Sequence, residues 1–162
     1  MSDLAFLSPS LASAVDGVSP RYRSPLEHAL AGAGDALRDL STLGKLEVRR
    51  ELDAALEAGA PEVVRIAPNR TLVLCEAEAA PALAAQLGAV DVSAALAGLA
   101  LSGERLMRRL TDLDLDGLPA MGAVAGIQCT VLRDEDEFRL FFAQEYGDHV
   151  AAVVLDAMAG LR

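Results

Sequence analysis

The 162-residue sequence is poor in the residue types that usually carry chemistry or bind flat ligands. It contains no tryptophan, two histidines and two cysteines, and aromatic residues make up 4% of it. Few side chains are therefore at hand for stacking on bases or on the rings of cofactors. Basic residues number 14 against 24 acidic ones, which gives a net charge of −10. Because this charge repels a phosphate backbone, we do not expect nucleic-acid binding.

Long hydrophobic runs and a basic leader segment are also missing. The most apolar stretch, residues 90–102, is shorter than the ~20 apolar residues that span a bilayer. No basic segment precedes the short apolar run at residues 4–7, as a secretory signal would require. We therefore expect a cytoplasmic protein in which Cys75 and Cys129 are buried free thiols, because both lie in apolar stretches. A disulfide between them is the less favoured alternative.

What the chain does contain is apolar, helix-favouring sequence. Hydrophobic residues make up 52% of it, and alanine (31) and leucine (27) dominate. The length predicts one domain with its own core, over residues 26–162. Residues 1–25 hold six serines and three prolines, which predicts an extended N-terminal arm. Its apolar residues Leu4, Phe6 and Leu7 predict that it packs either on its own domain or on a partner subunit.

The first half of the domain shows a regular order of predicted elements. They are a half-buried strand with alternating polarity (43–49), a helix (51–58), a hairpin of two strands (63–67 and 71–75) and a helix (80–87). Before this order begins, a short helix is predicted within residues 26–40, weakened by Gly32 and Gly34. Gly88 follows the last periodic position of the helix at 80–87 and predicts its end.

The second half repeats the order strand, helix, hairpin, helix. Its elements are a strand (94–102), a helix from Gly103 with Leu106, Leu110 and Leu113 on one face, a hairpin (123–132 and 137–143) and a closing helix (150–161). Asp39-Leu40-Ser41 matches Asp91-Val92-Ser93 at a separation of 52 residues, and both are typical of turns in which side chains cap backbone amides. These patterns predict an α+β fold of two similar units, 39–88 and 91–162, that share one core. Chance similarity in an alanine- and leucine-rich chain is the alternative.

No motif in the chain predicts a reaction centre. Residues 112–117 begin like a calcium loop, but Ala123 stands where its bidentate glutamate would be. His28 and His149 have no metal ligand at a suitable spacing, and there is no Gly-x-Ser-x-Gly elbow. We therefore predict no catalytic, cofactor-binding or metal-binding residue in this chain.

Two features of the second hairpin have alternative interpretations. The acidic residues 134–137 predict a solvated turn, or else a contact with a basic patch on a partner. Phe141 shares a strand face with Arg139, so we expect it to be exposed, as would suit an interface.

Several of these segments resemble a known fold family. The stretch Asp39-Leu40-Ser41-Thr42-Leu43-Gly44-Lys45-Leu46-Glu47-Val48 resembles the opening segment of the folate-binding fold of the glycine cleavage T protein. Residues 90–93 and 99–103 resemble that fold's internal Asp-x-Ser…Gly segment. Among the relatives with this fold, the present chain is most similar to the gamma subunit of heterotetrameric sarcosine oxidase, because it is short and the match opens near residues 23–26. The resemblance covers residues 23–162.

The chain departs from the folate-using members at one motif. Their Gly-Tyr-Thr-Gly run is absent, and Asp134-Glu135-Asp136 stands in its place between Arg133 and Glu137. The resemblance therefore implies a non-catalytic accessory subunit whose larger flavoprotein partners hold FAD, FMN, NAD and tetrahydrofolate. Such a complex oxidises sarcosine to glycine, forms hydrogen peroxide and passes the one-carbon unit to tetrahydrofolate. The isolated chain is expected to self-associate. The alternatives are a stand-alone folate-binding protein that uses a groove between the units, and an uncharacterised enzyme.

Overall fold

The computed structural model describes residues 23–31, 33, 36–52 and 61–161. Most of the predicted arm and of the predicted helix 51–58 lie outside these residues. The helix predicted over 26–40 is wrong where the structure describes it. Residues 25–31 form turns, and Leu37–Asp39 is strand β1. Because pairing with a distant strand supplies the hydrogen bonds of β1, tertiary contacts override the local helix preference.

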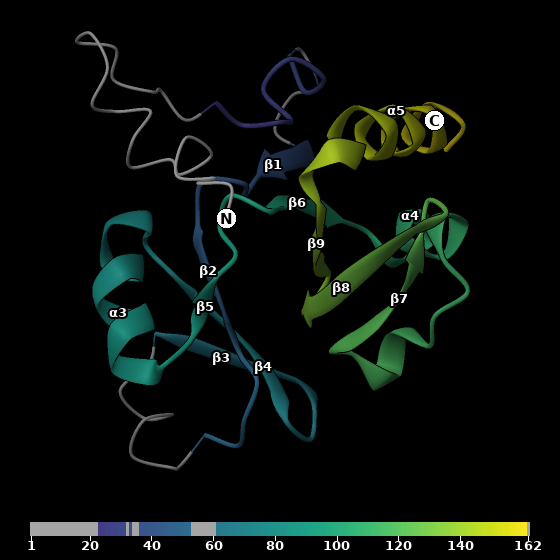
Figure 1. Cartoon of the computed structure of the whole chain (residues 1–162). Coiled ribbons are helices and arrows are strands. Elements are labelled where there is room, and N and C mark those ends of the chain that lie inside the picture. The colour runs from purple at the N-terminus through teal and green to yellow at the C-terminus, as the bar shows by residue number, and fades with distance from the viewer. Residues whose placement is uncertain (1–22, 32, 34–35, 53–60, 162) are drawn as a thin grey trace, which may run out of the picture.

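The predicted α+β class is confirmed, with two antiparallel sheets. The five-stranded sheet has the order β1-β6-β9-β8-β7 and the four-stranded sheet the order β3-β4-β2-β5 (Figure 1). The strands are β1 (Leu37–Asp39), β2 (Gly44–Val48), β3 (Glu62–Ala67), β4 (Arg70–Cys75), β5 (Val90–Asp91), β6 (Leu96–Ser102), β7 (Ala120–Val124), β8 (Ile127–Asp134) and β9 (Glu137–Ala143). The helices are α3 (Ala80–Leu87), α4 (Glu104–Leu110) and α5 (Gly147–Ala159), with short 3₁₀ turns η3 (Ala77–Ala79), η4 (Leu115–Gly117) and η5 (Gln144–Tyr146).

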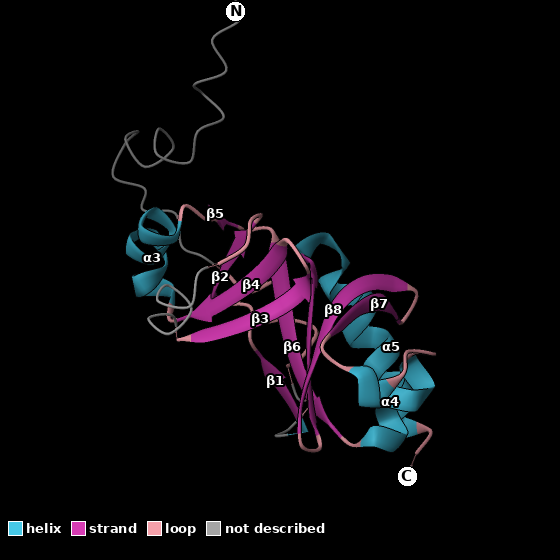
Figure 2. Ribbon diagram, turned by 90° about the horizontal axis from the view of Figure 1, so that it is seen from below, coloured by secondary structure: helices cyan, strands magenta, loops and turns pink. Residues whose placement is uncertain are grey.

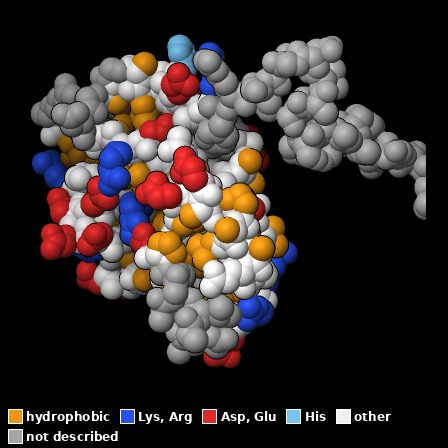
Figure 3. Space-filling view, turned by 90° about the vertical axis from the view of Figure 1, so that its left-hand side faces the viewer, with side chains coloured by type: hydrophobic (Ala, Val, Ile, Leu, Met, Phe, Trp, Pro, Cys, Tyr) orange, Lys and Arg blue, Asp and Glu red, His pale blue; other side chains and the backbone are white. Residues whose placement is uncertain are grey.

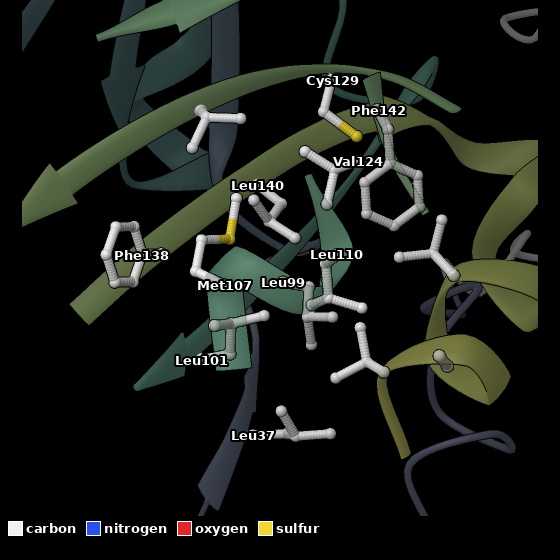
Figure 4. Packing of buried hydrophobic residues seen from close by; sticks show 14 of the residues in the cluster. Leu37, Leu99, Leu101, Met107, Leu110, Val124, Cys129, Phe138, Leu140 and Phe142 are labelled. Atoms are coloured by element: carbon white, nitrogen blue, oxygen red, sulfur yellow. The ribbon is translucent and has the colours of Figure 1, made fainter. Parts of the chain in front are cut away.

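The elements stack in four layers. Figure 2 shows α3 outside the four-stranded sheet, the two sheets facing each other, and α4 with α5 outside the five-stranded sheet. One core cluster packs α4 and α5 on the five-stranded sheet and includes Leu99, Met107 and Phe142 (Figure 4). A second cluster lies under α3, and a third fills the space between the sheets. The space between the sheets is therefore enclosed by strands from both halves of the sequence.

Most locally patterned elements are confirmed. The first hairpin forms as β3 and β4, and α3 ends at Gly88, whose φ of 57° is in the left-handed region. The strand expected at 123–132 is interrupted, because Ala125 and Gly126 make a turn between β7 and β8. Helix α4 ends at Leu110, before the predicted Leu113.

Two predictions about burial are wrong, for the same reason. All five residues of β2 are buried, although alternating exposure was expected. Phe141, expected to be exposed, is 2% exposed in the cluster between the sheets. A strand covered by helices on one face and by a second sheet on the other has no solvated side, so alternating polarity does not give alternating exposure.

Candidate functional site

The two sheets exchange their shortest strands. Strand β1 precedes β2 in the chain but pairs with β6, with Asp39 opposite Leu99. Strand β5 precedes β6 but pairs with β2, with Asp91 opposite Leu46. Each of these short strands therefore belongs to one sheet, while the strand that follows it in the chain belongs to the other. The matching Asp-x-Ser segments lie where these two exchanges occur.

The first Asp-x-Ser segment binds the backbone of Gly98 in β6. Asp39 Oδ1 accepts a hydrogen bond from the Ser41 N–H at 2.8 Å, as the capping turn predicted. Ser41 Oγ then accepts the Gly98 N–H at 3.1 Å and donates to the Gly98 carbonyl at 3.4 Å. The Leu40 N–H donates to the same carbonyl at 2.8 Å. Both backbone groups of Gly98 are thus held by the turn.

The second segment binds Lys45 in β2 in the same way. Asp91 Oδ1 accepts from the Ser93 N–H at 2.9 Å, and Ser93 Oγ accepts the Lys45 N–H at 2.8 Å. The Val92 N–H donates to the Lys45 carbonyl at 2.9 Å. The local capping was predicted, but the bond from each serine to the opposite sheet was not. We name this pair of segments, 39–41 and 91–93, the reciprocal turns.

Lys45 is the single lysine of the chain and is fully buried. Its Nζ donates to the carbonyl oxygens of Ser41 at 2.8 Å and of Leu43 at 2.7 Å. Burial lowers the pKa of Lys45 to about 8, against the opposing effect of the Asp39 and Asp91 carboxylates. The alternating pattern of residues 43–49 predicts Lys45 on a polar strand face. The sequence hint of its burial was that the other 13 of the 14 basic residues are arginines.

Gly98 occupies the position equivalent to Lys45 and has no room for a side chain. A Cβ atom there would lie 2.9 Å from both the Cβ and the carbonyl oxygen of Leu40. The close approach of segment 39–41 to β6 therefore requires glycine at this position.

A hollow of about 270 Å³ opens between the sheets, and we name it the inter-sheet hollow. Its walls are mainly apolar, and they come from both sheets and from the β5–β6 connection. The lining residues are Glu47, Ile66, Arg70, Leu72, Val92, Ala95, Leu96, Met121, Gln128, Thr130, Phe141, Phe142 and Ala143. This is the groove between the units that the sequence analysis considered for a ligand.

Among the described residues, Glu47 is the one carboxylate that lines the inter-sheet hollow, and two arginines hold it. Arg70 donates from Nη2 at 3.0 Å and from Nε at 3.1 Å, and Arg49 donates from Nε at 2.7 Å. Burial alone raises the pKa of Glu47, but the hydrogen bonds from Arg70 and Arg49 bring it below its usual value. Glu47 is therefore an ionised, fully paired carboxylate rather than a proton donor.

The opposite end of the β3–β4 hairpin is closed by an ion pair between the sheets. Arg139 of β9 donates from Nη1 and Nη2 to the Glu62 carboxylate at 2.8 and 2.6 Å. These hydrogen bonds raise the pKa of the Arg139 guanidinium, which keeps it charged. Its Nε is buried and makes no hydrogen bond within the part of the chain that the structure describes.

The acidic turn 134–137 makes several contacts within the molecule. Glu137 pairs with Arg38 at 2.8 Å, and the backbone carbonyl of Asp136 accepts the Gly103 N–H at 3.0 Å. The side chains of Asp134 and Glu135 are exposed. The turn therefore joins β1 and the start of α4 to the second hairpin, and its contact with a partner remains a prediction.

The calcium-like run and the two cysteines take part in local capping and in the buried core. In the calcium-like run, Leu115 is buried and Asp114 caps the Asp116 N–H at 3.1 Å. Cys75 and Cys129 are buried free thiols, and burial raises the pKa of Cys129 to about 12. Over residues 23–31, 33, 36–52 and 61–161, no three His, Cys, Asp or Glu side chains are grouped to hold a metal ion.

The exposed apolar surface is small. Large exposed hydrophobic side chains among the described residues are Val90, Met121 and Tyr146. Figure 3 shows hydrophobic side chains gathered on the face that carries α3. The exposed residues of α3 are small or uncharged, with Ala82, Ala85 and Gln86 among them. No helix in the described part of the chain has the length and apolar character needed to cross a membrane.

Comparison with known proteins gives a match at the level of structure. No family model matches the chain, and no curated protein matches its sequence. A chain of the heterotetrameric sarcosine oxidase from Corynebacterium sp. U-96, solved in complex with pyrrole 2-carboxylate, is 24% identical. The match covers 86% of this chain and 95% of that chain, with a TM-score of 0.69.

Two other solved structures are less similar. They are the aspartokinase alpha and beta subunits (13% identity, 76% and 97% covered, TM-score 0.45) and the regulatory subunit of aspartate kinase from Thermus thermophilus (8% identity, 75% and 96% covered, TM-score 0.48). The first match shows that this chain has the fold of a chain found in heterotetrameric sarcosine oxidase.

Proposed function

We propose that this chain is a non-catalytic accessory subunit of a heterotetrameric sarcosine oxidase-like complex. The observation that carries the proposal is the shared fold over 95% of a chain from such an enzyme. The sequence adds support, because the segments that resemble the folate-binding fold of the glycine cleavage T protein include both reciprocal turns, and the short chain opening near residues 23–26 resembles the gamma subunit.

The chemistry of the complex is proposed to reside in the partner subunits. They would hold FAD, FMN, NAD and tetrahydrofolate, oxidise the N-methyl group of sarcosine and release glycine and hydrogen peroxide. The described side chains of this chain support a structural role. The buried Lys45 and Glu47 and the half-buried Arg139 are engaged in hydrogen bonds that hold loops and sheets together. Groups held in this way do not present a free base or nucleophile.

The folate-binding fold of the T protein is proposed as the wider family. The Asp-x-Ser segments that carry this resemblance are used here to join the two sheets. They bind backbone groups within the chain, which supports their being a feature of the fold rather than of a ligand site.

Co-expression tests the proposed function. The chain would carry an affinity tag and be produced with the flavoprotein subunits of a heterotetrameric sarcosine oxidase. We expect a yellow complex that forms hydrogen peroxide when sarcosine is added. Recovery of the tagged chain alone, with the flavoproteins in the unbound fraction, would contradict the proposal. Titration of the isolated chain with tetrahydrofolate tests the alternative, which requires saturable binding.

A further inference from the structure

We infer that the inter-sheet hollow receives an apolar side chain of a partner subunit, and that a carboxylate next to that side chain binds Arg49 and Arg70. This inference rests on the proposed function, because it assigns the surface through which the subunit is held. It follows from the shape of the hollow, from the charge at its rim and from the kind of residues exposed there.

The hollow offers an apolar seat of limited size. Its floor includes Leu72 and Phe141, each 2% exposed, and Ala95 stands exposed at the opening. The volume of about 270 Å³ is below the ~300–1,000 Å³ that small-molecule pockets occupy. One large apolar side chain fits such a volume, and anchors of this kind account for much of the binding energy at interfaces.

The rim carries a local excess of positive charge on an acidic protein. Arg49 and Arg70 share the Glu47 carboxylate, and their side chains remain 72% and 41% exposed. In the part of the chain that the structure describes, no acidic side chain besides Glu47 lines the hollow. The chain as a whole has a net charge of −10, so this excess is local. It is complementary to a carboxylate on the partner and would orient the approaching segment.

The arrangement differs from the other carboxylate that two arginines share. Glu104 binds both Arg108 and Arg133, but Arg133 also contacts Asp116 at 3.5 Å, so that group is balanced. At the hollow, the Nη1 atom of Arg70 is not used by Glu47 and makes a weak contact, 3.6 Å from Met121 Sδ. Arg70 can therefore donate from Nη1 to a second carboxylate while Nε and Nη2 stay bound to Glu47.

The residues exposed at the rim are those that interfaces favour. Met121, one of the exposed large apolar side chains of the described region, lies at the rim beside Arg70. Methionine and arginine are enriched at protein interfaces relative to the rest of the surface. The face around α3 is also apolar, but its exposed side chains are small and its shape and charge give no indication of what covers it.

The test compares four tagged chains in the co-expression experiment. They are the wild type, Arg70→Glu, Ala95→Trp and the control Arg108→Glu, which breaks an exposed ion pair on α4. Arg70→Glu reverses the charge at the rim. Ala95→Trp fills the opening and leaves the Glu47 ion cluster intact, so it tests the hollow even if Arg70→Glu weakens the fold. Because the natural chain has no tryptophan, the fluorescence of the introduced indole also reports whether a partner covers the hollow.

We expect both rim variants to retain at least tenfold less flavoprotein than the wild type, and the control to stay within twofold of it. Equal retention by all four chains overturns this inference and leaves the proposed function standing. Failure of the wild type to retain any flavoprotein overturns the proposed function and the inference together. A loss with Arg70→Glu that Ala95→Trp does not reproduce also overturns the inference, because the hollow is then not the contact.

Discussion

Lys45 in β2 and Gly98 in β6 occupy equivalent positions in the two sheets but differ in the space available for a side chain. Each has its N–H bound by the serine of a reciprocal turn, and each has its carbonyl bound by the residue before that serine. At Gly98 there is no space for a single methyl group, whereas at Lys45 the longest aliphatic side chain is enclosed completely. The exchange of strands therefore depends on hydrogen bonds to backbone groups, and it is compatible with either a glycine or a buried lysine at the bound position.

The largest expected effect is at Gly98. In Gly98→Ala, the new methyl group would lie 2.9 Å from Leu40 and would push segment 39–41 away from β6. Overpacking of this kind costs about 3 kcal/mol in the free energy of unfolding, to be measured by urea denaturation. The control is Gly117→Ala, where the nearest atom is an Asp114 carboxylate oxygen at 3.5 Å. An equal loss in the two variants would contradict the close approach at Gly98.

The two serines test whether the reciprocal turns contribute equally. Ser41→Ala leaves the Gly98 N–H without its acceptor in a region where Ser41 is 1% exposed, and we expect a loss of about 2 kcal/mol. Ser93 is half-buried, so water can replace its hydroxyl, and Ser93→Ala should cost about 1 kcal/mol. Urea denaturation of both variants gives the comparison. A larger loss for Ser93→Ala would contradict the account of these turns.

The buried charge of Lys45 predicts a dependence of stability on pH. Its pKa is about 8 in the folded chain and 10.5 in the unfolded one. Between these values the unfolded chain holds a proton that the folded chain has released, so stability rises with pH. From pH 8 to 9.5 the free energy of unfolding should rise by about 1.5 kcal/mol relative to Lys45→Met.

Comparison with Lys45→Met removes the contribution of the Cys129 thiol and most of that of the Cys75 thiol, on whose pKa burial acts more strongly than Lys45. Burial raises the pKa values of Cys75 and Cys129, which lowers stability over the same pH range in both chains. Parallel curves of unfolding free energy against pH for the wild type and Lys45→Met would show that Lys45 is not held as described.

The smallest expected effect concerns the ion pair at the closed end of the space between the sheets. Glu62→Gln weakens the contact with Arg139, whose side chain is 18% exposed, and should lower the free energy of unfolding by about 1 kcal/mol. Glu137→Gln is the matched control, since its partner Arg38 is 59% exposed. We expect less than half the loss there, measured by thermal unfolding. Equal losses would mean that burial between the sheets adds nothing.

The elements that could be predicted are those whose pattern is local. Helix α3 and the β3–β4 hairpin follow from the spacing of apolar residues and from turn residues close in sequence. The capping of the Ser41 and Ser93 N–H groups was predictable for the same reason. The three residues of β1 were not, because this strand exists by pairing with β6, which lies in the second half of the chain.

The burial of Lys45 and Phe141 and the lining of the inter-sheet hollow depend on the packing of two sheets, which no local sequence pattern predicts. Phe141 and Lys45 lie on strand faces that looked half polar, yet both are buried because the sheets face each other. The inter-sheet hollow combines Glu47 with residues as distant as Ala143, and no local motif brings them together. The resemblance to a known fold suggested a groove between two units, but not the charges at its rim.

The most direct test of the proposed function is native mass spectrometry of the tagged chain recovered from cells that make its partner subunits. We expect a species far heavier than the 16.9 kDa of this chain, with bound flavin, and we expect the same preparation to form peroxide when sarcosine is added. A species of 16.9 kDa or a simple multiple of it, without flavin, would contradict the account.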